Sequence, residues 1–249
     1  MIVAQLLQGK TAFVTGGAAG LGLAIVEAFG AAGAHGIAFD PVTPDRPLPR
    51  GWSHRTGDVR DAEGLAGAFA LLKSDGLDLL VANAGVVPPW RESEAIDLEE
   101  WDAAFAVNVR GVMATIKLAL PLMKERGGSI IVMGSINAWV GHGCQAAYVA
   151  SKHAVLGIAR STAQDLGRYG IRVNALCPGP IATKALLERL RHRAEGGGMA
   201  EEEAMRKYSQ TALGRIATAA EVANAALFLA SDLSSGITGQ SIAVDAGAG

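Results

Sequence analysis

Cysteine is scarce in this sequence, and neither sign of charge dominates it. Only two cysteines occur in 249 residues, Cys144 and Cys177, which is too few for a disulfide framework or a zinc site. Such sparing use of thiols suits a reducing compartment, so we expect a cytoplasmic protein. The formal net charge is −2, so the composition indicates neither a nucleic-acid partner nor an acidic membrane surface. No group of histidines, cysteines and carboxylates has metal-ligand spacing, and we expect no catalytic metal.

Long apolar runs are missing as well. No uninterrupted run reaches the roughly 18 residues that a membrane span needs, so we expect no membrane partner. Residues Met1–Gln8 are partly apolar but carry no basic residue ahead of a cleavage site. We interpret them as a short lead into the first strand rather than as a signal peptide.

Short apolar runs alternate with segments of helical period along the whole chain. Hydrophobic residues make up 50% of the sequence and charged residues 18%, and no repeat or linker divides it. We therefore expect a single α/β domain over residues 1–249. The expected strands are Thr11–Thr15, Gly36–Phe39, Ser53–Thr56, Leu77–Ala82, Ser129–Gly134, Ile171–Leu176 and Gln240–Val244. The expected helices are Leu21–Ala32, Ala62–Lys73, Leu98–Met123, Ala147–Arg168 and Ala219–Ala230.

The expected strands lack the polar alternation of a sheet with one wet face. Strands buried on both faces predict a mainly parallel, seven-stranded sheet with helices on each side. One compositional break, Glu195–Glu203, is rich in glycine and then acidic. It is typical of a solvated surface loop, but its place after the sixth strand also suits a mobile substrate lid, which we assign to about residues 184–212.

A glycine-rich turn follows the first strand. Gly16, Gly20 and Gly22 let the chain turn sharply and bring bare backbone against a phosphate group. The helix that follows would point its N-terminal amides and its dipole at that anion. The turn has a strand before it and a helix after it, as a dinucleotide site requires.

Asp40 ends the second strand, 18 residues after Gly22. A carboxylate at this place can accept hydrogen bonds from ribose hydroxyls and would repel a 2′-phosphate. No arginine or lysine lies between Lys10 and Arg46 to attract that phosphate, so the sequence favours NAD as the cofactor over NADP. The alternative is that Asp40 merely starts a turn before Pro41.

Tyr148 and Lys152 are four residues apart on an expected helix and so share one face. An ammonium near a phenol favours the phenolate, and we expect it to lower the pKa of Tyr148 so that the phenol can exchange a proton with an alcohol. Ser135 follows an apolar strand at the carboxyl end, where open α/β sheets bind ligands. Its hydroxyl could hold the same substrate oxygen, although a serine at this place could also simply cap a helix.

These motifs occur in a characteristic order along the chain. The glycine-rich turn is followed by Asn83-Ala84-Gly85, Asn108, Ser135, Tyr148-x-x-x-Lys152 and Pro178-Gly179. Over essentially its whole length, the sequence resembles the short-chain dehydrogenase/reductase family. The resemblance implies a Rossmann-type, doubly wound fold and hydride transfer between NAD(H) and a secondary alcohol or ketone.

The resemblance also implies roles for individual residues. Tyr148 would be the general acid/base, Lys152 would bind the nicotinamide ribose and tune Tyr148, Ser135 would position the reacting oxygen, and Asn108 would hold a water for proton relay. The implied cofactor-binding residues are Gly16, Ala19, Gly20, Leu21, Gly22, Asp40, Asp58, Val59, Asn83, Ala84, Gly85, Tyr148, Lys152, Pro178, Gly179, Ile181 and Thr183. One departure is Ala82, where many members carry an asparagine. The helices at 98–123 and 147–168 would form a subunit interface in a homotetramer.

Several further side chains are candidates for a compact, partly apolar substrate pocket. They are Trp90, Ile136, Asn137, His142, Gln145 and Leu186. Two other functions stay open. One is a 3-oxoacyl-carrier-protein reductase using NADPH, for which Arg189, Arg191 and Arg193 could form a docking patch or merely a solvated helix face. The other is a non-catalytic dinucleotide-binding sensor, which would be expected to have lost one of the reacting residues.

Overall fold

A computed structural model describes residues 5–248, so Met1–Ala4 of the expected lead segment and Gly249 lie outside it. Seven strands form one sheet in the order β3-β2-β1-β4-β5-β6-β7, and every pairing is parallel. The strands are β1 (Thr11–Thr15), β2 (His35–Asp40), β3 (Trp52–Thr56), β4 (Leu79–Ala82), β5 (Gly128–Met133), β6 (Ile171–Pro178) and β7 (Ser241–Val244). The predicted fold class and strand count are confirmed.

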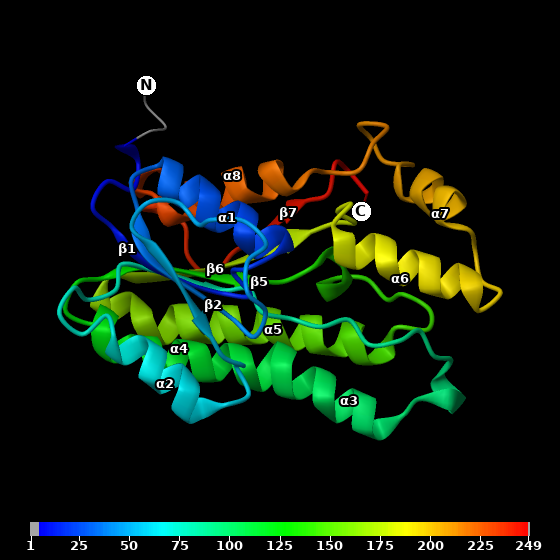
Figure 1. The fold of residues 1–249 in the computed structure, drawn as a ribbon, viewed down its shortest axis with the longest axis horizontal. Coiled ribbons are helices and arrows are strands. Elements are labelled where there is room, and N and C mark those ends of the chain that lie inside the picture. The colour runs from blue at the N-terminus through cyan, green and yellow to red at the C-terminus, as the bar shows by residue number, and fades with distance from the viewer. Residues whose placement is uncertain (1–4, 249) are drawn as a thin grey trace.

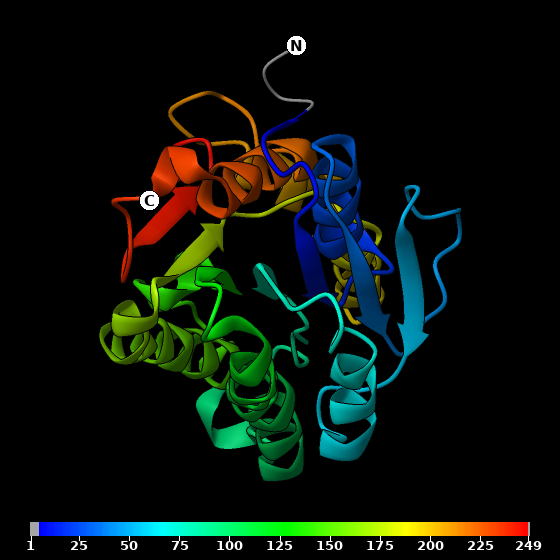
Figure 2. The ribbon, with the colours of Figure 1, turned by 90° about the vertical axis from the view of Figure 1, so that its left-hand side faces the viewer.

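Helices cover both faces of the sheet (Figures 1 and 2). One face carries α1 (Gly20–Ala31) and α8 (Ala219–Ala230), and the other carries α2 (Ala62–Ala70), α4 (Val112–Met123) and α5 (Ala146–Leu166). Successive residues of a strand point to opposite faces. Phe13 therefore packs in the cluster under α2, α4 and α5, whereas Val14 packs in the cluster under α1 and α8.

The strand order reverses between β1 and β4. The chain runs outward through β1, β2 and β3 and then returns to place β4 on the other side of β1. In such sheets the crevice beyond the carboxyl ends of the strands at this switch point is the usual ligand site. Asn83 and the glycine-rich turn both lie at this crevice, since they follow β4 and β1 directly.

The long helical stretch expected at Leu98–Met123 is interrupted. It consists of α3 (Leu98–Phe105), a π-helical segment η3 (Ala106–Gly111) and α4. Together they are long and apolar enough to cross a membrane by length and composition, although charged residues such as Arg110 and Lys117 interrupt every apolar run. Ile116 and Met123 of this stretch are buried in the core of the domain.

Two helices replace much of the predicted surface loop. The segment Glu195–Glu203 contains the end of α6 (Lys184–Glu195) and the start of α7 (Glu201–Tyr208), so only residues 196–200 connect them. Leu186, Leu190 and Ala204 form a small apolar cluster of their own, separate from the two main clusters. Figure 1 shows α6 and α7 beyond the right-hand end of the sheet.

Some predicted boundaries differ by a few residues. The helix expected at Ala62–Lys73 ends at Ala70, and the strand expected at Leu77–Ala82 begins at Leu79. The helix expected to reach Arg168 passes into a 3-10 turn, η5 (Gly167–Tyr169), which ends at Gly170 in a left-handed conformation with φ of 67°. Helix ends fray or tighten in this way because their last carbonyls lack partners within the helix.

Candidate active site

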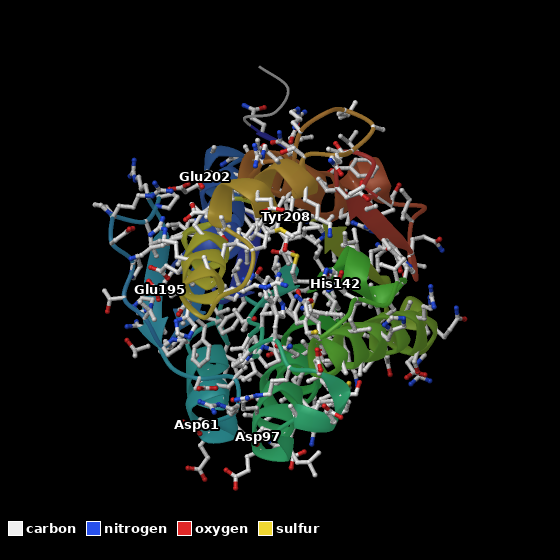
Figure 3. The ribbon with its side chains drawn as sticks, turned by 90° about the vertical axis from the view of Figure 1, so that its right-hand side faces the viewer. Asp61, Asp97, His142, Glu195, Glu202 and Tyr208 are labelled. Carbon is white, nitrogen blue, oxygen red and sulfur yellow. The ribbon has the colours of Figure 1, made fainter. Side chains whose placement is uncertain are left out.

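A cavity of about 1130 Å³ opens at the carboxyl ends of the strands. All the residues expected to bind the cofactor line it, and so do all six residues expected to shape the substrate pocket. Of the four expected catalytic residues, Ser135, Tyr148 and Lys152 line the cavity, whereas Asn108 does not. Figure 3 looks onto this end of the molecule, with His142 and Tyr208 near the middle of the face.

The glycine-rich turn forms a narrow cradle at one side of the cavity. Gly16 and Gly20 have φ of 64° and 52°, which side chains of L-residues rarely allow. A Cβ on Gly22 would lie 1.9 Å from the carbonyl oxygen of Gly16, so only glycine fits there. The cradle is thus shaped by bare backbone.

The N-terminus of α1 lies behind this cradle without a side-chain cap. Ala19 occupies the N-cap position, and no acidic residue stands in the first turn. By contrast, the carboxylates of Asp61 and Asp97 cap α2 and α3. Because the first amides of α1 have no side-chain acceptor, they are available to an anion such as a pyrophosphate.

Asn83 holds the turn in place from the neighbouring strand. Its side-chain amide donates to the carbonyl oxygens of Thr15 at 2.9 Å and Gly16 at 3.0 Å, and its backbone N–H donates to the Thr15 hydroxyl at 3.0 Å. Ala84 donates its backbone N–H to the same hydroxyl. Asn83 therefore ties the ends of β1 and β4 together, in addition to lining the cavity.

Asp40 is buried and its carboxylate is fixed at the edge of the cradle. One oxygen accepts the backbone N–H of Ala18 at 3.1 Å and the other accepts that of Val42 at 2.9 Å. The bond from Val42 is the contact expected of an aspartate that starts a turn, which was the alternative role for Asp40. A carboxylate has about four acceptor sites, so two further hydrogen bonds remain available toward the cavity.

Asp58 lies beyond Asp40 and is bound by a neighbouring arginine. The guanidinium of Arg60 donates to both oxygens of the Asp58 carboxylate: its Nε lies 3.1 Å from one and 3.0 Å from the other, and its Nη2 lies 2.6 Å from the second. The hydrogen bonds from Arg60 hold the pKa of Asp58 below its usual value. Arg60 also lines the cavity, and its charge is already neutralised by this pair.

The reacting groups meet between β5 and α5. Ser135 lies two residues after the end of β5 and accepts the backbone N–H of Asn137 at 3.2 Å, so it also begins the short turn η4 (Ile136–Ala138). Lys152 is buried, and its ammonium donates to the carbonyl oxygen of Met133 at 2.8 Å. The same ammonium lies 5.7 Å from the ring centroid of Tyr148.

The electrostatics of the pair differ from the prediction. Burial raises the pKa of Tyr148 above its usual value, and the Ser135 hydroxyl and then the charge of Arg189 act in the opposite direction. The predicted lowering by Lys152 is therefore wrong for this structure, because loss of hydration outweighs the nearby positive charges. Burial also lowers the pKa of Lys152 to about 8.

Asn108 is fully buried within the π-helical segment. Its side-chain oxygen accepts the backbone N–H of Val86 at 2.8 Å, and its amide donates to the Val86 carbonyl at 2.9 Å and to the Ser151 hydroxyl at 3.0 Å. Ser151 in turn donates to the carbonyl oxygen of Tyr148 at 2.8 Å. Both amide hydrogens of the Asn108 side chain are used in these bonds, so the side chain positions Val86 and Ser151, and a water held by Asn108 would have to donate to one of its oxygens.

Two side chains of the site were not singled out by the sequence. Arg189 on α6 and Tyr208 at the end of α7 both line the cavity. Arg189 was assigned only to a basic cluster, although its place three residues after the inward-facing Leu186 could have indicated a position on the same face. Nothing in the sequence indicated Tyr208.

The residues of the cavity fit a nicotinamide dinucleotide. The bare cradle and the uncapped helix suit its pyrophosphate, Asp40 suits ribose hydroxyls, and Tyr148 and Lys152 line the same cavity. Among residues 5–248 no three histidines, cysteines or carboxylates are grouped as metal ligands.

Comparisons with known proteins agree with this site. A family model described as enoyl-(acyl carrier protein) reductase matches residues 16–249. Xanthoxin dehydrogenase of Arabidopsis thaliana is 38% identical over 98% of this chain and 90% of its own, and D-beta-hydroxybutyrate dehydrogenase of Rhizobium meliloti is 33% identical over 96% and 98%. Carveol dehydrogenase of Mycobacterium avium, solved in complex with NAD, superposes with a TM-score of 0.89 at 30% identity, covering 98% of this chain and 99% of its own. Ligand-free aldohexose dehydrogenase of Thermoplasma acidophilum also gives 0.89 at 30% identity, over 97% and 94%. The chain belongs to the short-chain dehydrogenase/reductase family, and it is an oxidoreductase of alcohols and ketones.

Proposed function

We propose that this protein transfers a hydride between NAD(H) and a secondary alcohol or ketone, with Tyr148 as general acid/base. The observation that carries the proposal is that Ser135, Tyr148 and Lys152 line the same cavity as the glycine cradle and Asp40. A non-catalytic sensor is not favoured, because every reacting side chain is kept and lies at that cavity.

The bound dinucleotide supplies a nicotinamide that gains or loses the hydride. During oxidation Tyr148, as phenolate, takes the proton of the substrate hydroxyl, while the carbon loses its hydrogen with the electron pair. Ser135 holds the same oxygen by a hydrogen bond, and in the reduction direction Tyr148 returns the proton. The Ser135 hydroxyl and the charge of Arg189 favour the phenolate, and the Lys152 ammonium, held by Met133, can bind a ribose hydroxyl. Asn108 acts through Ser151 and Val86, and we keep its water-holding role as a prediction.

The preference for NAD rests on Asp40. Its carboxylate is buried at the cradle and cannot turn away without losing its bonds to Ala18 and Val42. A 2′-phosphate would meet this charge at close range, whereas ribose hydroxyls can donate to it. Among the cationic residues that line the cavity, Arg60 is nearest to Asp40 in the sequence. Arg60 is already paired with Asp58.

The contacts of α6 give no support to the docking patch of the alternative, a carrier-protein reductase. Arg191 forms an ion pair with Glu201 at 2.8 Å, and the guanidinium of Arg193 lies 3.9 Å from the ring centroid of Trp90. These groups are therefore engaged within the α6–α7 segment and do not form a free basic face toward an acidic carrier protein.

We also propose a homotetramer in a cytoplasmic setting. Met113 on α4 is 39% exposed, and Gly157 on α5 has open space above its backbone, so a second copy could approach these helices closely. Sedimentation of the wild type against Gly157→Trp tests this, because a bulky side chain at the interface should dissociate the assembly.

The test of the function is a panel of secondary alcohols, sugars, cyclic diols and hydroxyacyl thioesters, followed at the NADH absorbance with both cofactors. We expect turnover of a secondary alcohol with NAD, and a loss of about 10²- to 10⁴-fold in kcat for Tyr148→Phe with NADH binding retained. Near-wild-type turnover in Tyr148→Phe would remove the assigned mechanism, and turnover of thioesters with NADPH alone would favour the alternative.

A further inference from the structure

Arg189 is a positive charge on the cavity wall that has no partner among residues 5–248. Three arginines among residues 5–248 are shielded from full exposure: Arg91, Arg172 and Arg189. Arg91 is paired with Glu100 through two hydrogen bonds, and Arg172 donates to the Leu229 carbonyl and the Ser234 hydroxyl. Within the described residues, no ion pair or hydrogen bond joins the Arg189 guanidinium to another group.

The carboxylates of the cavity are all engaged elsewhere. Asp40 binds backbone amides, Asp58 binds Arg60, and Glu188 lies 3.8 Å from the ammonium of Lys184. None of the three is therefore placed to neutralise Arg189. Partial burial removes water from a guanidinium, and without an anion nothing compensates for that loss. Proteins usually avoid this arrangement unless a ligand supplies the negative charge.

The position of Arg189 relates it to the reacting end of the cavity. Arg189 lines the same cavity as Tyr148 and Tyr208, and its charge acts against the burial that raises the pKa of each of these hydroxyls. Burial lowers its own pKa, in agreement with a shielded charge. Apolar side chains line the same cavity, among them Leu186 and Trp90, which with Tyr208 belong to the small cluster of the α6–α7 segment.

On this basis, and resting on the proposed function, we propose that the substrate is a hydroxy acid or oxo acid whose carboxylate is bound by Arg189. The planar guanidinium can donate two parallel hydrogen bonds to a carboxylate, with the Tyr208 hydroxyl as a further donor. The carbinol carbon would then stand at Tyr148 and Ser135, and the apolar side chains would enclose the carbon chain between the two ends. Arg189 would thus determine specificity without taking part in proton transfer.

Two variants separate this role from a structural one. Arg189→Met removes the charge and keeps the length of the side chain, whereas Arg189→Lys keeps a charge but loses the bidentate geometry. Arg191→Met is the matched control, because Arg191 lies on the same helix, pairs with Glu201 and does not line the cavity.

The first measurement is binding to the NADH-bound protein by calorimetry, with straight-chain carboxylates from acetate to hexanoate and their primary amides as probes. We expect the carboxylates to bind about 10- to 100-fold more tightly than the matched amides, and this preference to vanish in Arg189→Met but persist in Arg191→Met. Equal affinity of acids and amides in the wild type, or a preference that survives in Arg189→Met, would overturn the proposal. A loss of NADH affinity in Arg189→Met would also overturn it, because the arginine would then serve the cofactor.

The second measurement compares the turnover of hydroxy acids with that of their methyl esters. We expect Arg189→Met to lower kcat/KM for the acids by about 10- to 100-fold, mainly through KM, and to leave the esters unchanged, with partial recovery in Arg189→Lys. If neutral alcohols turn over and no carboxylate preference exists, the proposed dehydrogenase stands and this inference falls. If carboxylates bind through Arg189 but nothing is oxidised or reduced, the anion subsite stands and the proposed function falls.

Discussion

The ammonium of Lys152 donates a hydrogen bond of 2.8 Å to the carbonyl oxygen of Met133, which joins the middle of the cavity to the last residue of β5. This bond fixes the lysine on α5 without neutralising it, since no ion pair in the described chain includes Lys152. A buried ammonium with only a carbonyl partner is costly to keep charged, so the pKa of Lys152 lies at about 8.

The pH profile of catalysis should report the phenol of Tyr148. In the proposed mechanism oxidation needs the phenolate of Tyr148, whose pKa burial raises, so kcat/KM for alcohol oxidation should increase as the pH rises above neutral. Reduction needs the phenol, which stays the main form below that raised pKa, so its rate should change little over the same range. The pKa of Lys152 lies at about 8, so this lysine is mostly uncharged where the phenolate forms, and Lys152→Met should leave the alkaline rise in place. Initial rates in both directions from pH 6 to 10 measure this, and an oxidation rate that is independent of pH, or an alkaline rise that moves in Lys152→Met, would contradict it.

The same lysine should make stability depend on pH. Its folded pKa of about 8 lies below the usual value of 10.5, so between these values the unfolded chain binds more protons than the native protein. The free energy of unfolding should then rise with pH by at most about 1.4 kcal/mol per unit from this group. Urea unfolding from pH 7 to 9.5 should show this rise in the wild type relative to Lys152→Met, and a constant difference between the two would refute the assignment.

The glycine cradle offers a test of cofactor binding that is separate from the chemistry. A methyl group at Gly22 would collide with the carbonyl of Gly16, so Gly22→Ala should displace the turn and weaken NADH binding by about 10-fold or more. Gly67→Ala is the control, because Gly67 lies inside α2 with nothing near its Cα and should gain about 0.5–1 kcal/mol in stability. Fluorescence titration with NADH and thermal unfolding measure the two effects. Unchanged affinity in Gly22→Ala would show that the cofactor does not use this turn.

Cofactor choice should change when the Asp40 carboxylate is removed. Asp40→Ser keeps a hydrogen-bonding group near Ala18 but removes the charge that faces a 2′-phosphate. We expect the ratio of kcat/KM for NAD to that for NADP to fall by about 10-fold or more, with most of the change in KM. Clear preference of the wild type for NADPH would contradict the role assigned to Asp40.

The sequence was sufficient to predict the parts of the fold that depend on local pattern. The apolar runs at Thr11–Thr15 and Ser129–Gly134 become central strands because both of their faces are covered, and the glycine turn lies where its neighbours predict. The order of the strands and the meeting of Asn83, Ser135 and Tyr148 at one edge follow from parallel topology.

Features that depend on tertiary packing were not predictable. The helical period of Leu98–Met123 gives no sign of the π-helical segment, which forms where the Asn108 side chain can bind Val86 and Ser151. The pKa of Tyr148 depends on how deeply the phenol is buried, which sequence spacing alone does not reveal. The direction in which the Arg189 side chain points likewise depends on how α6 and α7 pack around Leu190. Leu190 belongs to none of the sequence motifs.

The widened turn between α3 and α4 has an implication for how this chain tolerates changes in length. A π-helical turn accommodates one residue more than an α-helical turn, so deletion of a single residue from Ala106–Gly111 would allow an ordinary helix with the same faces before and after it. Ala104 and Ile116 would then keep their places in the interior, and the domain could still fold. The shortened protein would lose the buried position of the Asn108 side chain. It would then lose the two hydrogen bonds by which Asn108 holds Val86, in the loop after β4. We therefore expect the additional residue to matter for the positions of Val86 and Ser151 near Tyr148 more than for the architecture of the domain.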